Sequence, residues 1–290
     1  MLARVLLAVP NVSEGRDPAL VEALAAAFAP ARLLDVHRDA DHNRSVFTLA
    51  GEQGQVAQAL AAGARAAAEA IDITRHDGLH PHVGALDVAP VVYLEDGDRG
   101  AAVAEALTAA TLIGRLGIPV FLYGELATEP IRRERAELRR GGPALLTQRI
   151  GAGELVPDYG PAEIHPTAGA TLVTARPPLI AFNVELASDD VELARRIAAE
   201  LRESGGGLPG VRALGLLLAA TGRAQVSMNI HDFHVAPLPE IVEMIAARAP
   251  IAEAELVGLA PAAAFEGFPG EIRVRARRTI EEALDPAQSS

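Results

Sequence analysis

Three histidines lie close together in the segment HDGLHPHVGALD, which covers residues 76–87. A histidine side chain titrates near neutrality, so it can both accept and donate a proton in a reaction. His76 and His80 have helical spacing, but Gly78 lies between them and Pro81 disfavours the helical conformation at His80. The segment is therefore expected to form a turn that enters a strand, and to carry the chemistry of the protein.

A second polar cluster, DVHRDADHNR, covers residues 35–44 between two expected strands. Because a core strand would not carry so many ionisable side chains, this segment must be solvated or line a site. A solvated loop with local turns is one interpretation. The other is that the intervening helix returns the chain so that both clusters lie at the same end of a sheet. The presence of two clusters favours the second, in which Asp35, Asp39 or Asp41 would orient an imidazole.

The composition excludes several kinds of chemistry, because the chain contains neither cysteine nor lysine. It has no thiolate nucleophile, no disulfide, no Schiff-base amine and no phosphate-binding lysine. Arginine remains as the group that binds carboxylates through two parallel hydrogen bonds. A net charge of -12 with 3% aromatic residues argues against a nucleic-acid partner. The short apolar run at residues 6–9 predicts a first strand, so we expect no membrane partner and a cytoplasmic location.

A metal site is an alternative use of the same two clusters. Their possible ligands are His37, Asp39, Asp41, His42, His76, His80 and His82. The spacing does not match a helix that carries two histidines one turn apart with an intervening glutamate. We therefore expect acid–base chemistry and no metal.

Hydrophobic periodicity predicts alternating strands and helices in the first half of the chain. Strands are expected at residues 2–9, 33–36, 45–50, 86–93 and 120–123, and helices at residues 17–27, 53–71, 101–116 and 130–140. Asp17 and Pro18 form a helix N-cap and first-turn pair. This alternation is typical of a sheet covered by helices.

The pattern weakens between residues 141 and 178, where glycine, proline and turn residues are frequent. Only a strand at residues 170–176 is expected there. A second block then begins, with strands at 179–186, 214–220 and 224–230, a helix capped near Asp189 and another from Pro239. We predict an α/β (α+β) fold with two subdomains, residues 1–177 and 178–290. Each would have a mixed β-sheet covered by helices, with a cleft between the two.

Several motifs together resemble the formiminotransferase family. They are VPNVSEGRD at residues 9–17, HNRSVFTLAG at 42–51, the histidine loop, LYGELA at 122–127, VPDYGPAEIHPTAGAT at 156–171 and LIAFNVEL at 179–186. The resemblance covers nearly the whole chain, and no cyclodeaminase domain is expected to follow.

The resemblance implies transfer of a formimino group from N-formimino-L-glutamate to N5 of tetrahydrofolate, a step of histidine degradation in one-carbon metabolism. It also implies a homodimer. The family's catalytic histidine precedes proline, which makes it His80, and the expected catalytic set is completed by His82 and Asp39. His42, Asn43 and Arg44 are expected to bind substrate, with Arg38 and Arg75 as weaker candidates. The folate-binding segment corresponds to Tyr159, Gly160, Pro161, Ala162, Glu163, Ile164, His165, Pro166, Thr167 and Ala168.

Two positions depart from the mammalian members of the family. An arginine after the His-Pro dipeptide is replaced by His82, and a tryptophan in the folate segment is replaced by Ala168. His82 is expected to be a second acid–base group, because residues 80 and 82 share one side of an extended chain. A metal-assisted hydrolase of a formimino or amide bond and a noncatalytic folate-binding protein remain the alternatives.

Overall fold

The computed structural model describes residues 5–78 and 80–285. The chain divides into two compact units, Met1–Pro177 and Pro178–Ser290. Each unit contains its own mixed β-sheet and its own helices, which confirms the predicted fold class. None of the described helices is long and apolar enough to cross a bilayer.

The first unit is built on a seven-stranded sheet. Its strands are β1 (Leu6–Ala8), β2 (Asn11–Val12), β3 (Arg32–Asp39), β4 (Arg44–Gly51), β5 (Leu86–Val92), β6 (Val120–Leu122) and β7 (Thr171–Arg176). The strand order is β1-β4-β2-β5-β7-β6, and β3 pairs with β4. Strand β7 pairs in parallel with β5 and β6. Strand β4 pairs in antiparallel with β1, β2 and β3.

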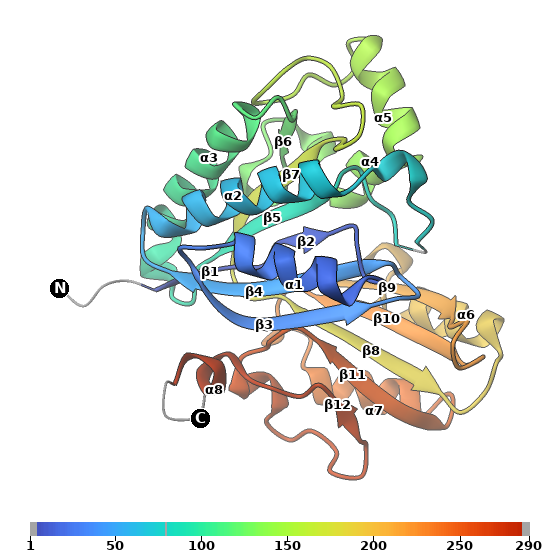
Figure 1. Cartoon of the computed structure of the whole chain (residues 1–290). Coiled ribbons are helices and arrows are strands. Elements are labelled where there is room, and N and C mark those ends of the chain that lie inside the picture. The colour runs from blue at the N-terminus through green and yellow to red at the C-terminus, as the bar shows by residue number, and fades with distance from the viewer. Residues whose placement is uncertain (1–4, 79, 286–290) are drawn as a thin grey trace. The chain divides into compact units, whose positions relative to one another are not determined.

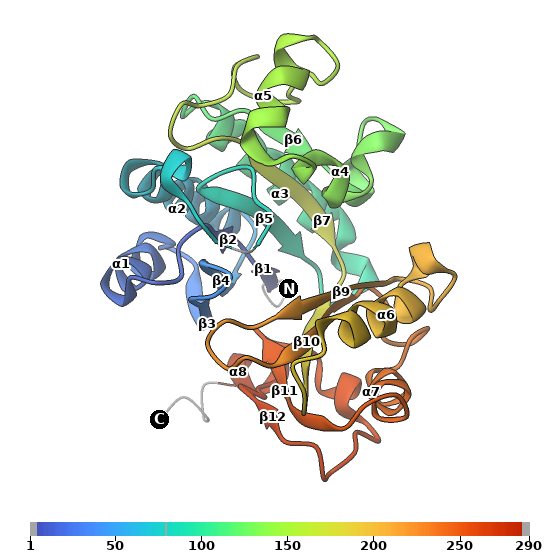
Figure 2. The ribbon, with the colours of Figure 1, turned by 90° about the vertical axis from the view of Figure 1, so that its right-hand side faces the viewer.

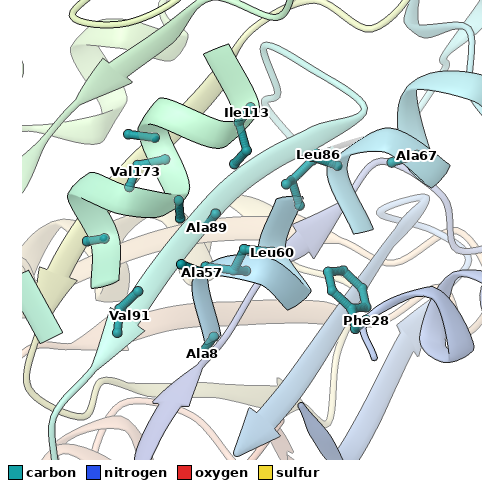
Figure 3. Close-up of a cluster of buried hydrophobic side chains, with 14 of the residues drawn as sticks. Ala8, Phe28, Ala57, Leu60, Ala67, Leu86, Ala89, Val91, Ile113 and Val173 are labelled. Carbon is teal, nitrogen blue, oxygen red and sulfur yellow. The ribbon is translucent and has the colours of Figure 1, made fainter. Parts of the chain in front are cut away.

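Two long helices cover one face of this sheet (Figure 1). They are α2 (Gln55–Ala70) and α3 (Arg99–Gly114), and α1 (Pro18–Ala27) packs beside α2. The α1 helix begins where the sequence predicts, because the Asp17 side chain accepts hydrogen bonds from the amides of residues 19 and 20. Figure 3 shows Ala57 and Leu60 of the alanine-rich helix α2 next to Ala89 of β5. Small side chains allow this close approach of helix and strand.

A smaller core lies on the opposite face of the same sheet. It joins Phe121 and Leu172 of the sheet to Leu138 of α4 (Arg135–Arg139) and Leu146 of α5 (Gly142–Gly151). The continuous helix predicted at residues 130–140 is wrong, since a 3-10 turn and α4 replace it.

The irregular stretch predicted after residue 140 is also wrong in its first part, because α5 occupies it. Glycines with positive φ angles flank this helix at Gly141 and Gly153, and these breaking signals conceal it in the sequence. Burial of Leu146 and Ile150 stabilises the helix between them.

The second polar cluster is also more regular than expected, because β3 continues through Asp39 and β4 begins at Arg44. Only residues 40–43 form the turn of a hairpin. A strand can carry these charged residues because β3 lies at the edge of the sheet, where its outward side chains reach water.

The second unit has a five-stranded sheet in the order β12-β11-β8-β10-β9. Its elements are β8 (Ile180–Leu186), α6 (Val191–Leu201), β9 (Val211–Leu217), β10 (Ala224–Ile230), α7 (Leu238–Ala246), β11 (Ile251–Val257), β12 (Val274–Arg275) and α8 (Ile280–Leu284). Figure 2 shows α6 lying along β9 and β10, which it contacts. The strand predicted at residues 214–220 begins and ends three residues earlier, as β9. Elements β11, β12 and α8 were not predicted.

Short 3-10 helices complete the described elements. They are Ile73–Arg75, Asp96–Asp98, Gly124–Leu126, Pro130–Arg132, Glu203–Gly205 and Ala262–Phe265. The Ile73–Arg75 turn directly precedes the histidine loop, which is not helical in its described residues, as predicted.

Candidate active site

The two polar clusters predicted to share one end of the sheet do meet. The backbone of Gly78 lies so close to the carbonyl oxygen of His42 that a Cβ atom at residue 78 would be 2.3 Å from it. The rings of His42 and His80 have centroids 6.3 Å apart. The Arg16 guanidinium at the start of α1 forms an ion pair with Asp77 of the histidine loop. The hairpin turn and the histidine loop therefore form one site in the first unit.

His80 is held by Arg44, whose Nη1 lies 2.6 Å from its Nε2 atom. A guanidinium only donates hydrogen bonds, so Nε2 must be the acceptor and the imidazole must be neutral. Burial lowers the pKa of His80 well below its usual 6.5, and the positive charges of Arg44, Arg139 and Arg135 lower it further. The neutral ring can act as a base once its Nε2 lone pair is released.

His42 has a different partner, the carboxylate of Asp39. One carboxylate oxygen accepts from the His42 amide at 2.9 Å, and the other lies 2.6 Å from His42 Nδ1. Burial raises the pKa of Asp39, but the hydrogen bonds from His42 outweigh it and leave that pKa at about 2. Asp39 was one of three aspartates predicted as candidates to orient His80, and its observed contact is with His42 instead. This pair leaves His42 Nε2 as the atom that can exchange a proton.

Asn43 joins the parts of the site to each other. Its Oδ1 accepts a hydrogen bond from the Gly15 amide at 2.9 Å, and its Nδ2 lies 3.4 Å from His76 Nδ1. Its backbone has a φ angle of 47°, a left-handed conformation that asparagine tolerates better than most residues. Both ends of the amide are thus engaged by the protein, which supports a positioning role for the predicted substrate-binding Asn43.

His82 lies beside His76, with ring centroids 4.2 Å apart. Its Nδ1 is 3.4 Å from the carbonyl oxygen of His80. Burial, and then the nearby His82, lower the pKa of His76. The two predicted histidines 80 and 82 therefore have different neighbours, although both belong to the same loop.

The histidine loop is anchored where it enters β5. The Asp87 carboxylate accepts a hydrogen bond from the Val83 amide at 2.8 Å and forms a buried ion pair with Arg139 of α4. The Ser13 hydroxyl donates to the Gly84 carbonyl oxygen at 2.7 Å. Ser13 is therefore a structural link between β2 and the loop, and its hydroxyl proton is directed to a backbone oxygen.

The predicted folate segment runs next to the histidine loop. Its Thr167 carbonyl oxygen accepts from the amide of Ile73, and its Ala168 carbonyl oxygen accepts from the amide of Ala85, each at 2.9 Å. Gly84 and Gly169 pair in an isolated bridge, and a Cβ atom on either would lie within 2.1 Å of a backbone oxygen on the other strand. The close approach of the two segments thus depends on glycine at both positions.

The side chains of the folate segment divide into anchored and exposed groups. His165 Nδ1 accepts from the Ala168 amide at 3.0 Å, which indicates a structural role in the turn, and Ala168 is 2% exposed. Tyr159 pairs with Val120 through backbone hydrogen bonds. Half-buried Ile164 packs on the smaller core. The exposed members are Gly160, Pro161, Ala162, Glu163 and Pro166.

The two weaker arginine candidates do not contact the site histidines in the described residues. Arg38 donates from Nη1 to the Gly15 carbonyl oxygen at 3.3 Å. Arg75 has a side chain that is 88% exposed and lies 3.6 Å from Asp72, which fits a solvated residue. Within residues 5–78 and 80–285, no three histidine or carboxylate side chains are grouped so as to hold a metal ion.

Three further arginines were not singled out by the sequence. Arg135 and Arg139 lie one helical turn apart on α4, and Arg176 ends β7. Their positive charges act on one another, and those of Arg135 and Arg139 act on Arg44 and His80. For Arg135 and Arg139, the only sequence signal is their four-residue spacing within α4. Arg176 has no such signal, because it lies on a strand that is distant in the sequence.

Known proteins are similar to this chain over both units. A family model described as the formiminotransferase domain, N-terminal subdomain, matches residues 5–176, and one described as the formiminotransferase domain matches residues 181–267. The chain is 40% identical to a glutamate formimidoyltransferase of Streptococcus pyogenes, with 91% of both chains covered. It is 38% identical to one of Thermoplasma acidophilum, with 87% of both chains covered.

A formimidoyltransferase-cyclodeaminase of Gallus gallus is 38% identical across 90% of this chain, which spans 51% of that longer protein. The matches run through both units and include the residues of the histidine loop and the hairpin. On this evidence, the chain belongs to the formiminotransferase family.

Proposed function

We propose that this protein transfers the formimino group of N-formimino-L-glutamate to N5 of tetrahydrofolate, its co-substrate. The observation that carries the proposal is the 40% identity, across 91% of both chains, with a protein named glutamate formimidoyltransferase. The contacts of His80 and His42 support an acid–base role for these two rings in such a transfer. The reaction would serve histidine degradation and one-carbon metabolism.

The reaction requires two proton movements. The N5 amine attacks the formimino carbon, forms a new carbon–nitrogen bond and loses a proton. The bond between that carbon and the glutamate nitrogen breaks, and the glutamate nitrogen gains a proton. One or two groups with suitable pKa values can serve both steps.

His80 is proposed as the base that accepts the N5 proton. Its ring is neutral, and its Nε2 lone pair is bound by Arg44 at 2.6 Å. A carboxylate of the donor is a stronger partner for a guanidinium than a neutral imidazole is. Binding of the donor to Arg44 would therefore release Nε2 at the moment when a base is needed.

His42, with Asp39, is proposed as the group that protonates the glutamate nitrogen. The carboxylate accepts from Nδ1 and so leaves Nε2 as the ring nitrogen that would carry the proton to the leaving group. His82 remains a proposed second acid–base group, although its ring packs on His76. Residues 159–168 are proposed to bind folate, supported by their backbone pairing with the histidine loop.

The test of the proposed function is the loss of N-formimino-L-glutamate in the presence of tetrahydrofolate. Replacing His80 by alanine should lower kcat by about 10²–10⁴-fold, the usual contribution of a general acid–base group, while binding of both substrates changes little. His234→Ala is the matched control, because His234 is exposed and packs on Phe233 in the second unit. An unchanged kcat in the His80 variant would reject its role.

We further propose that the protein is a homodimer in the cytoplasm. The dimer is supported by the family resemblance, and sedimentation of the purified protein measures it. The location is likewise proposed from the family resemblance.

A further inference from the structure

The folate segment begins on the outer edge of the first sheet. Strand β6 is the last strand in the sheet order and pairs with β7 on one side. On its other side, the Val120 amide donates to the Tyr159 carbonyl oxygen at 2.9 Å. Farther along the same edge, the Leu122 amide donates to the Asp158 carboxylate at 2.7 Å. Residues 158 and 159 thus supply acceptors for edge amides that the sheet itself leaves unpaired.

The Asp158 carboxylate is held by a buried arginine. Arg132 is the last residue of the 3-10 helix Pro130–Arg132, and its Nη1 donates to Asp158 Oδ2 at 2.8 Å. Its Nη2 donates to the Val156 carbonyl oxygen, also at 2.8 Å. The Arg132 side chain is 3% exposed and that of Asp158 is 11% exposed. Because a guanidinium is planar and rigid, these two bonds fix both the carboxylate and the chain that leads to it.

A third partner of this pair lies at the surface. The hydroxyl of Thr128, an exposed residue, donates to Asp158 Oδ1 at 3.0 Å. Both oxygens of the carboxylate therefore accept hydrogen bonds from protein donors. This arrangement indicates that Asp158 positions the chain and does not itself contact a ligand.

The residues that follow this anchor are exposed. Gly160 has a φ angle of 81°, and a Cβ atom there would lie 2.6 Å from the Ile118 carbonyl oxygen, so the chain turns at a position that favours glycine. The next three residues have exposed side chains, and they are Pro161, Ala162 and Glu163. The other end of the segment is fixed by the backbone hydrogen bonds of Thr167 and Ala168. The exposed part is thus fastened at both ends, and the pair of Arg132 and Asp158 fastens the first.

We propose that the ion pair of Arg132 with Asp158 sets the affinity for tetrahydrofolate by holding residues 160–164 in their binding conformation. The inference rests on the proposed function and deepens it, because it names the residues that hold the folate segment. Both are positioning residues. A ligand that binds a segment already held in place loses less of its binding free energy to ordering that segment. Neither residue was among the predicted site residues, because they are 26 positions apart and meet only in the folded chain.

The experiment measures tetrahydrofolate binding and the KM of each substrate with the full chain. Arg132→Gln and Asp158→Asn should each raise the Kd and KM for tetrahydrofolate by about tenfold, because the loosened segment must then be ordered on binding. The KM for N-formimino-L-glutamate should change little. Thr128→Ala removes one surface hydrogen bond to the same carboxylate and should have a smaller effect on folate alone.

A double variant tests whether the two residues act as one unit. Effects within one ion pair are not additive, so Arg132→Gln combined with Asp158→Asn should bind tetrahydrofolate about as weakly as either single variant. Arg132→Lys should keep part of the affinity, because it retains the charge without the guanidinium fork. Arg133→Gln is the matched control, since Arg133 is the next residue in the chain and is exposed.

Thermal unfolding of each variant distinguishes positioning from stability, because removing one partner of a buried ion pair also destabilises a fold. A lower Tm with an unchanged folate Kd would overturn the proposal. An equal rise in the KM of both substrates would overturn it too, since the whole site would then be distorted. If the variants of the buried pair do not fold, Thr128→Ala decides, and an unchanged folate Kd in that variant refutes the proposal.

The transfer assay separates this inference from the proposed function. Absence of transfer by the wild type, together with tetrahydrofolate binding that depends on the ion pair, would refute the reaction and support the inference. Transfer with an unchanged folate Kd in all the variants would support the reaction and refute the inference. A wild type that does not bind tetrahydrofolate would refute both.

Discussion

The hydrogen bond between Arg44 and His80 predicts how activity depends on pH. Burial and the arginine charges keep the pKa of His80 well below 6.5, so the ring stays neutral as the pH falls through 6.5. The acid limb of kcat/KM should therefore lie below that pH, since this limb reports protonation of the base in the free enzyme.

Replacing Arg44 by glutamine should move the acid limb to higher pH. The substitution removes a positive charge that disfavours the imidazolium, so the pKa of His80 rises toward its usual value. The pH profile of kcat/KM measures the shift, and the position of the limb is independent of the lower rate expected from weaker substrate binding. Arg38→Gln is the control, because Arg38 contacts the Gly15 backbone. A limb that stays in place would contradict this account.

Part of the site could be predicted at the scale of single residues. The sequence singled out His80 and Arg44 and predicted that their two polar clusters lie close together. The hydrogen bond between the two side chains was not predicted, because Arg44 was expected to bind a substrate carboxylate. The partner of Asp39 was not predictable, because a turn of the hairpin decides which histidine it reaches. Arg139 was missed because α4 reaches the histidine loop only through tertiary packing, by the ion pair of Arg139 with Asp87.

At the scale of elements, the β3–β4 hairpin turn depends on Asp39, which accepts from both the backbone and the ring of His42. Its pKa is about 2 instead of the usual 3.8. The carboxylate therefore stabilises the fold by roughly 2 kcal/mol at neutral pH. This stability is fully present above the unfolded pKa and is lost as the pH falls from 3.8 toward 2.

Asp39→Asn should accordingly lower the free energy of unfolding by about 2 kcal/mol at pH 7, and this difference should shrink near pH 2.5. Urea unfolding at the two pH values measures both. The neighbouring Asp41→Asn is the control and should have little effect. A difference that does not depend on pH would show that the charge of Asp39 does not contribute to stability.

The sequence predicts the long, regular elements well and the short or flanked ones poorly. Helix α2 and strand β5 were placed to within about two residues, because their apolar runs are long and their ends carry turn signals. Helix α5 was missed because glycines lie on both sides of it, and β11 was missed because Glu253 and Glu255 alternate with its apolar residues.

At the scale of the whole molecule, each unit has a core made from its own residues. The two clusters of buried side chains in the first unit lie within residues 6–175, and the cluster of the second unit lies within residues 180–265. We therefore propose that residues 1–177 and 178–290 are separate subdomains, as the sequence predicts.

A fragment of residues 1–177 should accordingly fold alone and unfold cooperatively with heat, which circular dichroism at 222 nm would follow. Its core contains Phe28, Phe47 and Leu60, each at most 1% exposed. A fragment that loses ellipticity gradually, without a transition, would show that the first core requires the second unit.

The paired glycines at positions 84 and 169 also set the distance between the two backbone segments of the site. Backbone hydrogen bonds on both sides of this pair fasten the base-bearing loop to the segment proposed to hold the pterin. The distance between the proton acceptor and the bound nucleophile is thus set when the sheet assembles, before any substrate arrives. Evolution can vary the side chains along both segments to change specificity, while the spacing between them is inherited from the main chain.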